Sequence, residues 1–270
     1  TINDVQIAAT GEITVATDVF TVNGDCDIDG DITVTTGTVD VDGVFDATGG
    51  FVTFTGAGNL TLDSTVTSLG TLSTANGTVT YNGDTAQTIV AGAYPSLKAS
   101  DAAGTKTLGG AVTVAGGLII DASVTVDMNG NTLGVTGTTD IDGVLDVADN
   151  ILTLGGASNL GGTMTISTGT VDANGAFDAT SGTITFSGAG NLTLASTVTD
   201  LGTLSGDGTV AYDGAGDQGI VEDIYYNLTA GSGGIKTLGG AVTVTNDLTI
   251  DTDVTIAMGI NNLTVTGAAN

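Results

Sequence analysis

Short stretches of alternating apolar and polar residues recur along the chain at intervals of about 20 residues. The segments 12–15 (EITV), 31–34 (DITV) and 51–54 (FVTF) follow this interval, and similar segments at 19–22 (VFTV) and 38–41 (TVDV) fall between them. Alternation of this kind is typical of strands with one buried face. Gly, Asn and Asp between the segments favour tight corners. The pattern predicts an all-β fold, a parallel β-solenoid with three short strands in each coil of about 20 residues.

A longer repeat is superimposed on the short one. Residues 53–62 (TFTGAGNLTL) return almost unchanged at 185–194, and residues 106–114 (KTLGGAVTV) return at 236–244. The sequence therefore contains two tandem copies of a unit of about 131 residues. The predicted parts are copy 1 at 1–131, copy 2 at 132–262, and a partial third copy or terminal strand at 263–270. No linker separates the copies, which predicts one continuous rod, whereas β-sandwich repeats are the alternative fold.

Charge restricts the partners of this chain. Three Lys and no Arg stand against 30 acidic residues, giving a formal net charge of −27. Nucleic acid and anionic membrane surfaces are not expected partners, because both need a basic footprint. No apolar run approaches the ~20 residues that span a bilayer, so no membrane span is expected. One Cys and no Trp or His favour an extracellular or cell-surface location.

One acidic segment carries part of a calcium-loop pattern. Asp25, Asp27 and Asp29 precede Gly30 in a D-x-D-x-D-G arrangement, which places hard oxygen ligands close to a sharp turn. The twelfth position of the loop is Thr36 rather than Glu, so the full pattern fails. These three Asp are either solvent-facing strand residues or weak Ca²⁺ ligands, and no other cofactor is expected.

The residues of common catalytic sites are missing. A nucleophilic triad needs a base such as His, and the chain contains neither His nor Arg. Asp pairs could act as acid and base on a sugar polymer, but the sequence favours a protein that is not an enzyme. Lys106 and Lys236 occupy equivalent places in the two copies, where each is expected to pair with a carboxylate of an adjacent coil. Tyr residues could stack on sugars, but they are expected to pack the longer loops. They are Tyr81, Tyr94, Tyr212, Tyr225 and Tyr226.

Threonine-rich segments suggest two surface properties. Thr-x-Thr pairs could stack into ranks that order water, which would allow ice binding, although Thr is also an ordinary strand residue. N-x-[ST] triplets are candidate glycosylation sites in a secreted protein. The five candidates are Asn59, Asn76, Asn191, Asn227 and Asn262.

Both ends of the chain are strand-like rather than capped. Unpaired edges of a solenoid recruit further strands, so head-to-tail association that propagates into a filament is expected. Divalent cations are expected to influence this assembly by screening the acidic faces. The residues expected at the interface between subunits are Ile2, Val5, Ile7, Leu263 and Val265.

Three short sequence segments resemble those of a known group of surface proteins. Residues 109–114 (GGAVTV), 226–229 (YNLT) and 246–250 (NDLTI) resemble the very long β-strand-repeat surface proteins of bacteria and archaea, which are akin to filamentous-haemagglutinin and adhesin stalks. The resemblance implies an extracellular structural or adhesive role without active-site residues. A self-assembling structural protein is therefore expected, and a surface adhesin or stalk that binds glycan, Ca²⁺ or ice is the alternative.

Overall fold

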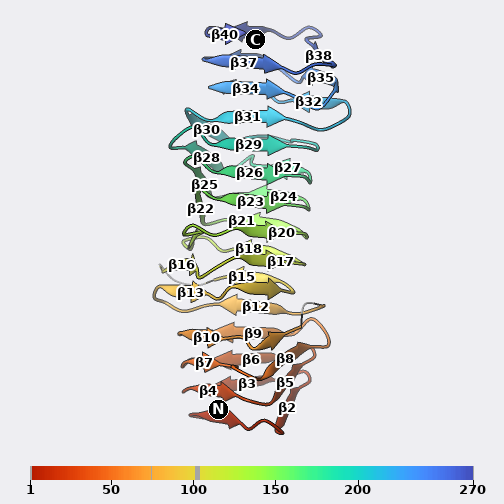
Figure 1. The fold of residues 1–270 in the computed structure, drawn as a ribbon. Helices are drawn as coiled ribbons and strands as arrows, with labels where there is room; N and C mark the ends of the chain where they lie inside the picture. The colour runs from red at the N-terminus through yellow and green to blue at the C-terminus, as the bar shows by residue number, and fades with distance from the viewer. Residues whose placement is uncertain (1, 74, 101–103, 270) are drawn as a thin grey trace. The chain divides into compact units, whose positions relative to one another are not determined.

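The computed structural model describes residues 2–73, 75–100 and 104–269. Over these ranges the chain is an all-β parallel β-solenoid of about 14 coils of about 19 residues, without any helix (Figure 1). The fold class predicted from the sequence is confirmed. The β-sandwich alternative is wrong, because strands of successive coils pair in parallel rather than antiparallel. No described residues form a helix able to cross a membrane.

The chain divides into two compact units, unit 1 (residues 1–137) and unit 2 (residues 138–270). Strands in unit 1 have two to four residues. They are β1 (Val5–Ile7), β2 (Glu12–Val15), β3 (Val19–Val22), β4 (Cys26–Ile28), β5 (Asp31–Val34), β6 (Thr38–Val41), β7 (Phe45–Asp46), β8 (Phe51–Phe54), β9 (Asn59–Leu62), β10 (Val66–Ser68), β11 (Thr71–Leu72), β12 (Thr78–Tyr81), β13 (Gln87–Ile89), β14 (Gly92–Tyr94), β15 (Leu97–Ala99), β16 (Thr105–Leu108), β17 (Val112–Val114), β18 (Leu118–Ile120), β19 (Thr125–Asp127) and β20 (Leu133–Val135).

Unit 2 is built from strands of two to five residues. They are β21 (Thr139–Ile141), β22 (Val144–Ala148), β23 (Ile151–Leu154), β24 (Ser158–Leu160), β25 (Thr163–Ile166), β26 (Thr170–Ala173), β27 (Phe177–Asp178), β28 (Thr183–Phe186), β29 (Asn191–Leu194), β30 (Thr203–Gly206), β31 (Thr209–Tyr212), β32 (Gln218–Ile220), β33 (Asp223–Tyr225), β34 (Asn227–Ala230), β35 (Gly234–Leu238), β36 (Val242–Val244), β37 (Asp247–Ile250), β38 (Val254–Ala257), β39 (Leu263–Val265) and β40 (Ala268–Ala269).

The core of unit 1 consists of columns of inward-facing side chains. Val39 in β6 pairs with Leu60 in β9, which pairs with Val79 in β12, and all three side chains are fully buried. Alternate residues of each strand must face the interior because successive side chains of a strand point to opposite sides. Cys26 in β4 belongs to this core, since it is 1% exposed, and burial followed by the charge of Asp27 raises the pKa of its thiol to about 12.

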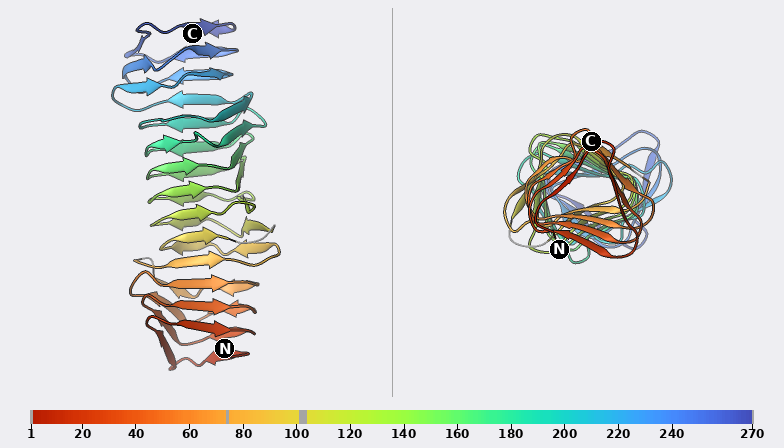
Figure 2. Two further views of the ribbon diagram at one scale, coloured as in Figure 1. Left: turned by 180° about the vertical axis from the view of Figure 1, so that it is seen from behind. Right: turned by 90° about the horizontal axis from the view of Figure 1, so that it is seen from below.

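Unit 2 repeats the same construction. Leu152, Val171, Leu192 and Val210 pair in succession along β23, β26, β29 and β31, and each is at most 1% exposed. Figure 2 shows the strands of each unit wound coil by coil around an interior. The buried side chains of these columns lie inside it. A parallel ladder places equivalent residues of neighbouring strands ~4.8 Å apart, so like side chains stack on like. The outward-facing positions are therefore free to carry charge or to form surface hollows.

Candidate functional site

Unit 2 contains a buried lysine held by oxygen acceptors from different coils. The Nζ atom of Lys236 donates hydrogen bonds to the carbonyl oxygens of Gly214 (2.5 Å) and Gly216 (3.1 Å) and to Oε1 of Gln218 (3.3 Å). The amide of Gln218 in turn donates to the carbonyl oxygens of Leu194 and Ser196, both at 2.7 Å. The Lys236 and Gln218 side chains thus connect three successive passes of the chain, an arrangement called here the Lys–Gln bridge.

Unit 1 has the same bridge at the equivalent positions. Lys106 Nζ donates to Oε1 of Gln87 (2.8 Å) and to the carbonyl oxygen of Gly83 (2.5 Å). The Gln87 amide donates to the carbonyl oxygens of Leu62 (2.9 Å) and Ser64 (2.6 Å). The side chains of Lys106 and Lys236 are both fully buried. The bridge is therefore a repeated part of the core, and its amines cannot reach a substrate in solution.

The acceptors of Lys236 correct one expectation from the sequence. Lys236 was expected to pair with a carboxylate, but among the described residues no carboxylate oxygen lies within ion-pair distance of it, and its partners are neutral oxygens. Burial lowers the pKa of Lys236, while the charges of Asp213 and Asp217 oppose that shift. An ammonium group has three donors, and three oxygen atoms receive them here.

A pair of buried tyrosines lies near each bridge. The hydroxyl groups of Tyr81 and Tyr94 are 2.9 Å apart, and Tyr94 also donates to the carbonyl oxygen of Val90 at 2.6 Å. Tyr212 and Tyr225 form the equivalent pair, also at 2.9 Å. Burial raises the pKa of Tyr81 to about 12. These four tyrosines pack the loops that they were expected to pack, and they are too buried to serve as a stacking surface for a ligand.

The predicted calcium ligands lie on or beside β4. Asp25 and Asp29 are exposed and Asp27 is half-buried, because Cys26 and Ile28 between them face the core. Asp25 Oδ1 accepts a hydrogen bond from the Val44 backbone N–H at 2.8 Å, and Asp27 Oδ2 accepts one from the Gln6 side chain at 3.1 Å. The calcium-loop hypothesis for these residues stays a prediction.

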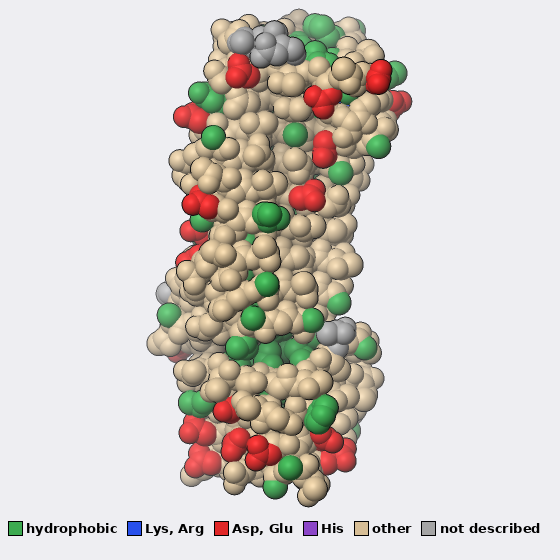
Figure 3. Space-filling view, viewed as in Figure 1, with side chains coloured by type: hydrophobic (Ala, Val, Ile, Leu, Met, Phe, Trp, Pro, Cys, Tyr) green, Lys and Arg blue, Asp and Glu red, His purple; other side chains and the backbone are tan. Residues whose placement is uncertain are grey.

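A different acidic group is brought together by the stacking of coils. Carboxylate oxygens of Asp40, Asp42 and Asp63 lie within 4.8 Å of one another, the only such group in the described part of the chain. Asp63 Oδ1 also accepts a hydrogen bond from Asn82 Nδ2 at 3.0 Å. Burial, then the charges of Asp63 and Asp42, raises the pKa of Asp40. Figure 3 shows acidic side chains gathered over the first coils of unit 1.

Replacing Asp42 with Asn is expected to stabilise the folded chain slightly, by about 0.2–1 kcal/mol, since the three neighbouring carboxylates repel one another. The folded pKa of Asp40 lies above its unfolded value, so this group adds stability as the pH falls through the raised pKa, and the benefit of Asp42→Asn should shrink over the same range. Urea unfolding at pH 7 and at pH 4, at low ionic strength, measures both effects. A destabilised variant at pH 7 would contradict the repulsion.

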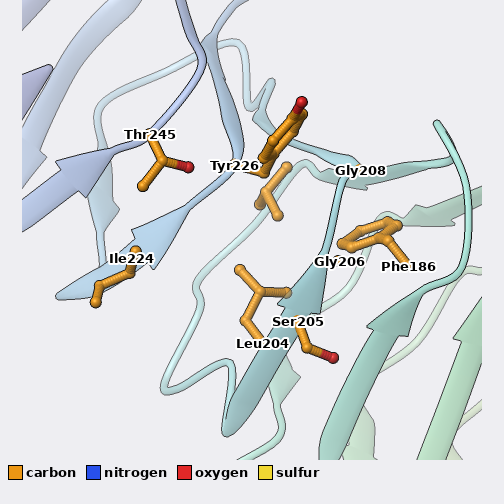
Figure 4. Close-up of a pocket in the computed structure, with 9 residues that line it drawn as sticks. Phe186, Leu204, Ser205, Gly206, Gly208, Ile224, Tyr226 and Thr245 are labelled. Atoms are coloured by element: carbon orange, nitrogen blue, oxygen red, sulfur yellow. The ribbon is translucent and has the colours of Figure 1, made fainter. Parts of the chain in front are cut away.

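Unit 2 has a surface hollow that the sequence did not predict. Its volume is about 190 Å³. Figure 4 shows the side chains of Phe186, Leu204, Ile224, Tyr226 and Thr245 arranged around it. Its remaining lining consists of Ser205, Gly206, Gly208 and Val210. The hollow lies where β30, β31 and β33 and the residue after β33 meet, and its lining mixes apolar side chains with hydroxyl groups.

The glycosylation candidates occupy two kinds of position. Asn76 and Asn262 are exposed and lie outside the strands, where an attached glycan would point into solvent. Asn59, Asn191 and Asn227 are half-buried first residues of strands, and Asn227 Oδ1 accepts a hydrogen bond from Asn246 at 2.8 Å. Glycosylation at all five positions stays a prediction.

We compared the chain with known protein families, curated proteins and solved structures. No family model, no curated protein and no solved structure matches the chain. What the molecule shows is a parallel β-solenoid with two Lys–Gln bridges, a stacked acidic group and a neutral surface hollow.

Proposed function

We propose that the chain is an extracellular structural protein that assembles head-to-tail, each copy adding its terminal coil to that of the next. The observation that carries this proposal is the exposure, at both ends of the described structure, of side chains that are buried elsewhere. The resemblance to β-strand-repeat surface proteins and the strongly acidic composition support the same function.

The first coil has an open edge. Strands β1 and β2 each pair on one side, with β4 and β5, and β3 pairs with β6 while Ile2 alone forms a bridge to Val22 on its other side. Ile2 is 48% exposed. Ile13 in β2 and Phe20 in β3 are half-buried, whereas their partners Ile32 in β5 and Val39 in β6 are fully buried. Val5 is half-buried and Ile7 is 5% exposed. The coil therefore presents unpaired backbone groups together with apolar side chains, which is the combination that recruits another strand.

The last coils show the same exposure, and unit 1 provides the comparison. Val124, Val126, Met128, Leu133 and Val135 of unit 1 are all at most 2% exposed. Their counterparts in unit 2 are Val254, Ile256, Met258, Leu263 and Val265, of which Met258 is 43% exposed and the other four are half-buried. In unit 1 a following coil buries this segment, whereas no following coil buries it at this end of the described structure.

A second copy is a suitable cover for both ends. Pairing the last coil of one copy with the first coil of the next continues the parallel ladders by strand addition. The two surfaces differ, so the contact is heterologous and repeats without closing, which yields a filament. Ile2, Val5, Ile7, Leu263 and Val265, the interface residues expected from the sequence, belong to these terminal coils.

Single charges at the ends should abolish assembly. We expect the 270-residue chain to form a concentration-dependent series of polymers in sedimentation velocity, and unbranched filaments in electron microscopy. Ile13→Lys and Met258→Lys should each keep it monomeric, because the equivalent residues Ile32 and Met128 are fully buried by the next coil and a charge buried at such a contact is costly. Met258 is 43% exposed in the single chain, so a charge there stays in contact with solvent until a second copy covers it.

Phe51→Lys is the matched control for these two variants. Phe51 is 49% exposed, but its strand β8 pairs on both sides, with β5 and β11. The Phe51→Lys variant should polymerise like the parent. A parent chain that stays monomeric at every concentration, or end variants that assemble as well as the parent, would show that the proposed function is wrong.

A further inference from the structure

The hollow in unit 2 has an unusual electrostatic character for this protein. None of its nine lining residues carries a charge at neutral pH, in a chain with a net charge of −27. A cation site would need carboxylate or several carbonyl oxygens, and an anion would be repelled by the surrounding acidic surface. The lining therefore favours a neutral ligand.

The size and the chemistry of the hollow further restrict the ligands that fit it. Pockets for drug-sized molecules have volumes of about 300–1,000 Å³, so a hollow of about 190 Å³ accommodates roughly one six-membered ring. Ile224 is 64% exposed and lies on a different side of the hollow from the Tyr226 ring, so each gives the hollow apolar surface open to solvent (Figure 4). An aromatic or aliphatic wall of this kind packs against the C–H face of a sugar.

Hydroxyl groups complete the recognition surface. The Tyr226 hydroxyl has no hydrogen-bond partner among the described residues, so it is available to a ligand. Thr245 Oγ1 donates to the carbonyl oxygen of Tyr225 at 3.2 Å and retains its capacity to accept. Ser205 Oγ makes only long contacts, at 3.4 Å to Thr185 Oγ1 and 3.5 Å to the carbonyl oxygen of Ile184.

The two copies differ at this hollow. Where unit 2 has Ile224, Tyr226 and Thr245, the equivalent positions of unit 1 hold Ala93, Pro95 and Ala115. The core residues next to these positions are the same in both copies. Tyr225 and Val244 of unit 2 correspond to Tyr94 and Val114 of unit 1, and all four are buried. Three surface residues have therefore been replaced on a shared scaffold, and all three line the hollow.

We propose that this hollow binds one neutral hexopyranose ring of a glycan. The side chains of Ile224, Leu204 and Tyr226 offer apolar surface to the ring, and the hydroxyl groups of Tyr226 and Thr245 bond its hydroxyls. The proposal stands independently of filament assembly, because none of these residues belongs to the terminal coils.

The test is NMR titration of the 270-residue chain with methyl-labelled Ile, Leu and Val. The probes are methyl β-D-galactopyranoside, methyl α-D-mannopyranoside and N-acetylglucosamine, each added separately. At least one should shift the methyl signals of Ile224 and Leu204 saturably, with a dissociation constant in the millimolar range. Apolar p-cresol serves as a fourth probe, of similar size but lacking the sugar hydroxyls.

Variants that copy unit 1 separate binding from folding. Tyr226→Pro and Ile224→Ala introduce residues that the same scaffold already holds in unit 1, and each should weaken the sugar by about tenfold or more. Ile151→Ala, a control at an Ile that is 55% exposed and outside the hollow, should leave the affinity unchanged. The proposal is overturned if no sugar shifts these signals, if the variants bind as tightly as the parent, or if p-cresol alone binds.

Discussion

Replacing Lys236 with Met is expected to lower the free energy of unfolding by about 2–4 kcal/mol. The variant keeps the length of the side chain but removes all three N–H donors. The carbonyl oxygens of Gly214 and Gly216 and Oε1 of Gln218 then lose the hydrogen bonds that they receive in the interior. Buried acceptors without donors are costly because water cannot replace the lost partner. Urea unfolding followed by circular dichroism measures the change.

Lys98→Met is the matched control for the Lys–Gln bridge. Lys98 forms an ion pair with Asp121 at 2.8 Å, but both side chains are about one-third exposed. Exposed ion pairs contribute about 0–1 kcal/mol, so this variant should unfold almost as the parent does. Equal losses for Lys98→Met and Lys236→Met would mean that burial of the amine is not what gives the bridge its stability.

Gly162→Ala is expected to destabilise the fold by about 1–3 kcal/mol through overpacking. A Cβ atom at this position would lie 1.9 Å from the carbonyl oxygen of Gly143 and 2.5 Å from that of Asp142, so the backbone of one coil would have to move away from the coil beneath it. Gly30 is the equivalent residue in unit 1, where a Cβ atom would lie 2.3 Å from the carbonyl oxygen of Gly11. Thermal unfolding of the variant measures the effect.

Gly219→Ala provides the comparison for this substitution. Gly219 is the central residue of β32, and a Cβ atom there meets no atom within 4 Å. Unit 1 carries Thr88 at the same place, so the coil tolerates a side chain. The variant should be neutral or slightly more stable, because Gly is a poor strand residue. A loss as large as that of Gly162→Ala would indicate that close approach between coils is not the cause.

The solenoid could be predicted because its strands and corners each require a pattern that is visible within a few residues of the sequence. The segments expected as strands at 12–15, 31–34 and 51–54 are β2, β5 and β8, with the same bounds. Each coil must bury one side of every strand and turn within a few residues, which imposes the alternation and the Gly-rich corners. A fold dictated by such local rules leaves little room for a wrong prediction.

The Lys–Gln bridge was predicted only in part. The recurrence of Lys106 and Lys236 is visible in the sequence, but Lys236 was expected to pair with a carboxylate, since opposite charges usually compensate a buried amine, and its partners are neutral oxygens. Gln87 and Gln218 carried a signal that was overlooked. Each lies two residues before a buried Ile, at Ile89 and Ile220, and this spacing places the amide on the inner side of its strand.

The surface hollow and the acidic group could not be predicted from spacing within one segment. Asp40 and Asp63 are far apart in the chain and meet because β6 stacks on β9. The hollow depends on how β30, β31 and β33 stack, and on differences between two otherwise similar copies. Such sites are set by the number of residues in each coil, and one insertion changes which side chains become neighbours.

The reactivity of Cys26 can report how often the first coils open. Cys26 is shielded from solvent, and its pKa of about 12 keeps it protonated at neutral pH. Because the thiolate is the reactive form, an alkylating reagent can modify Cys26 rapidly only when β4 becomes exposed. The alkylation rate therefore reports how often the first coils open, without any engineered label. A neighbouring copy bound at that edge would slow the reaction, so the same thiol can distinguish free ends from occupied ones.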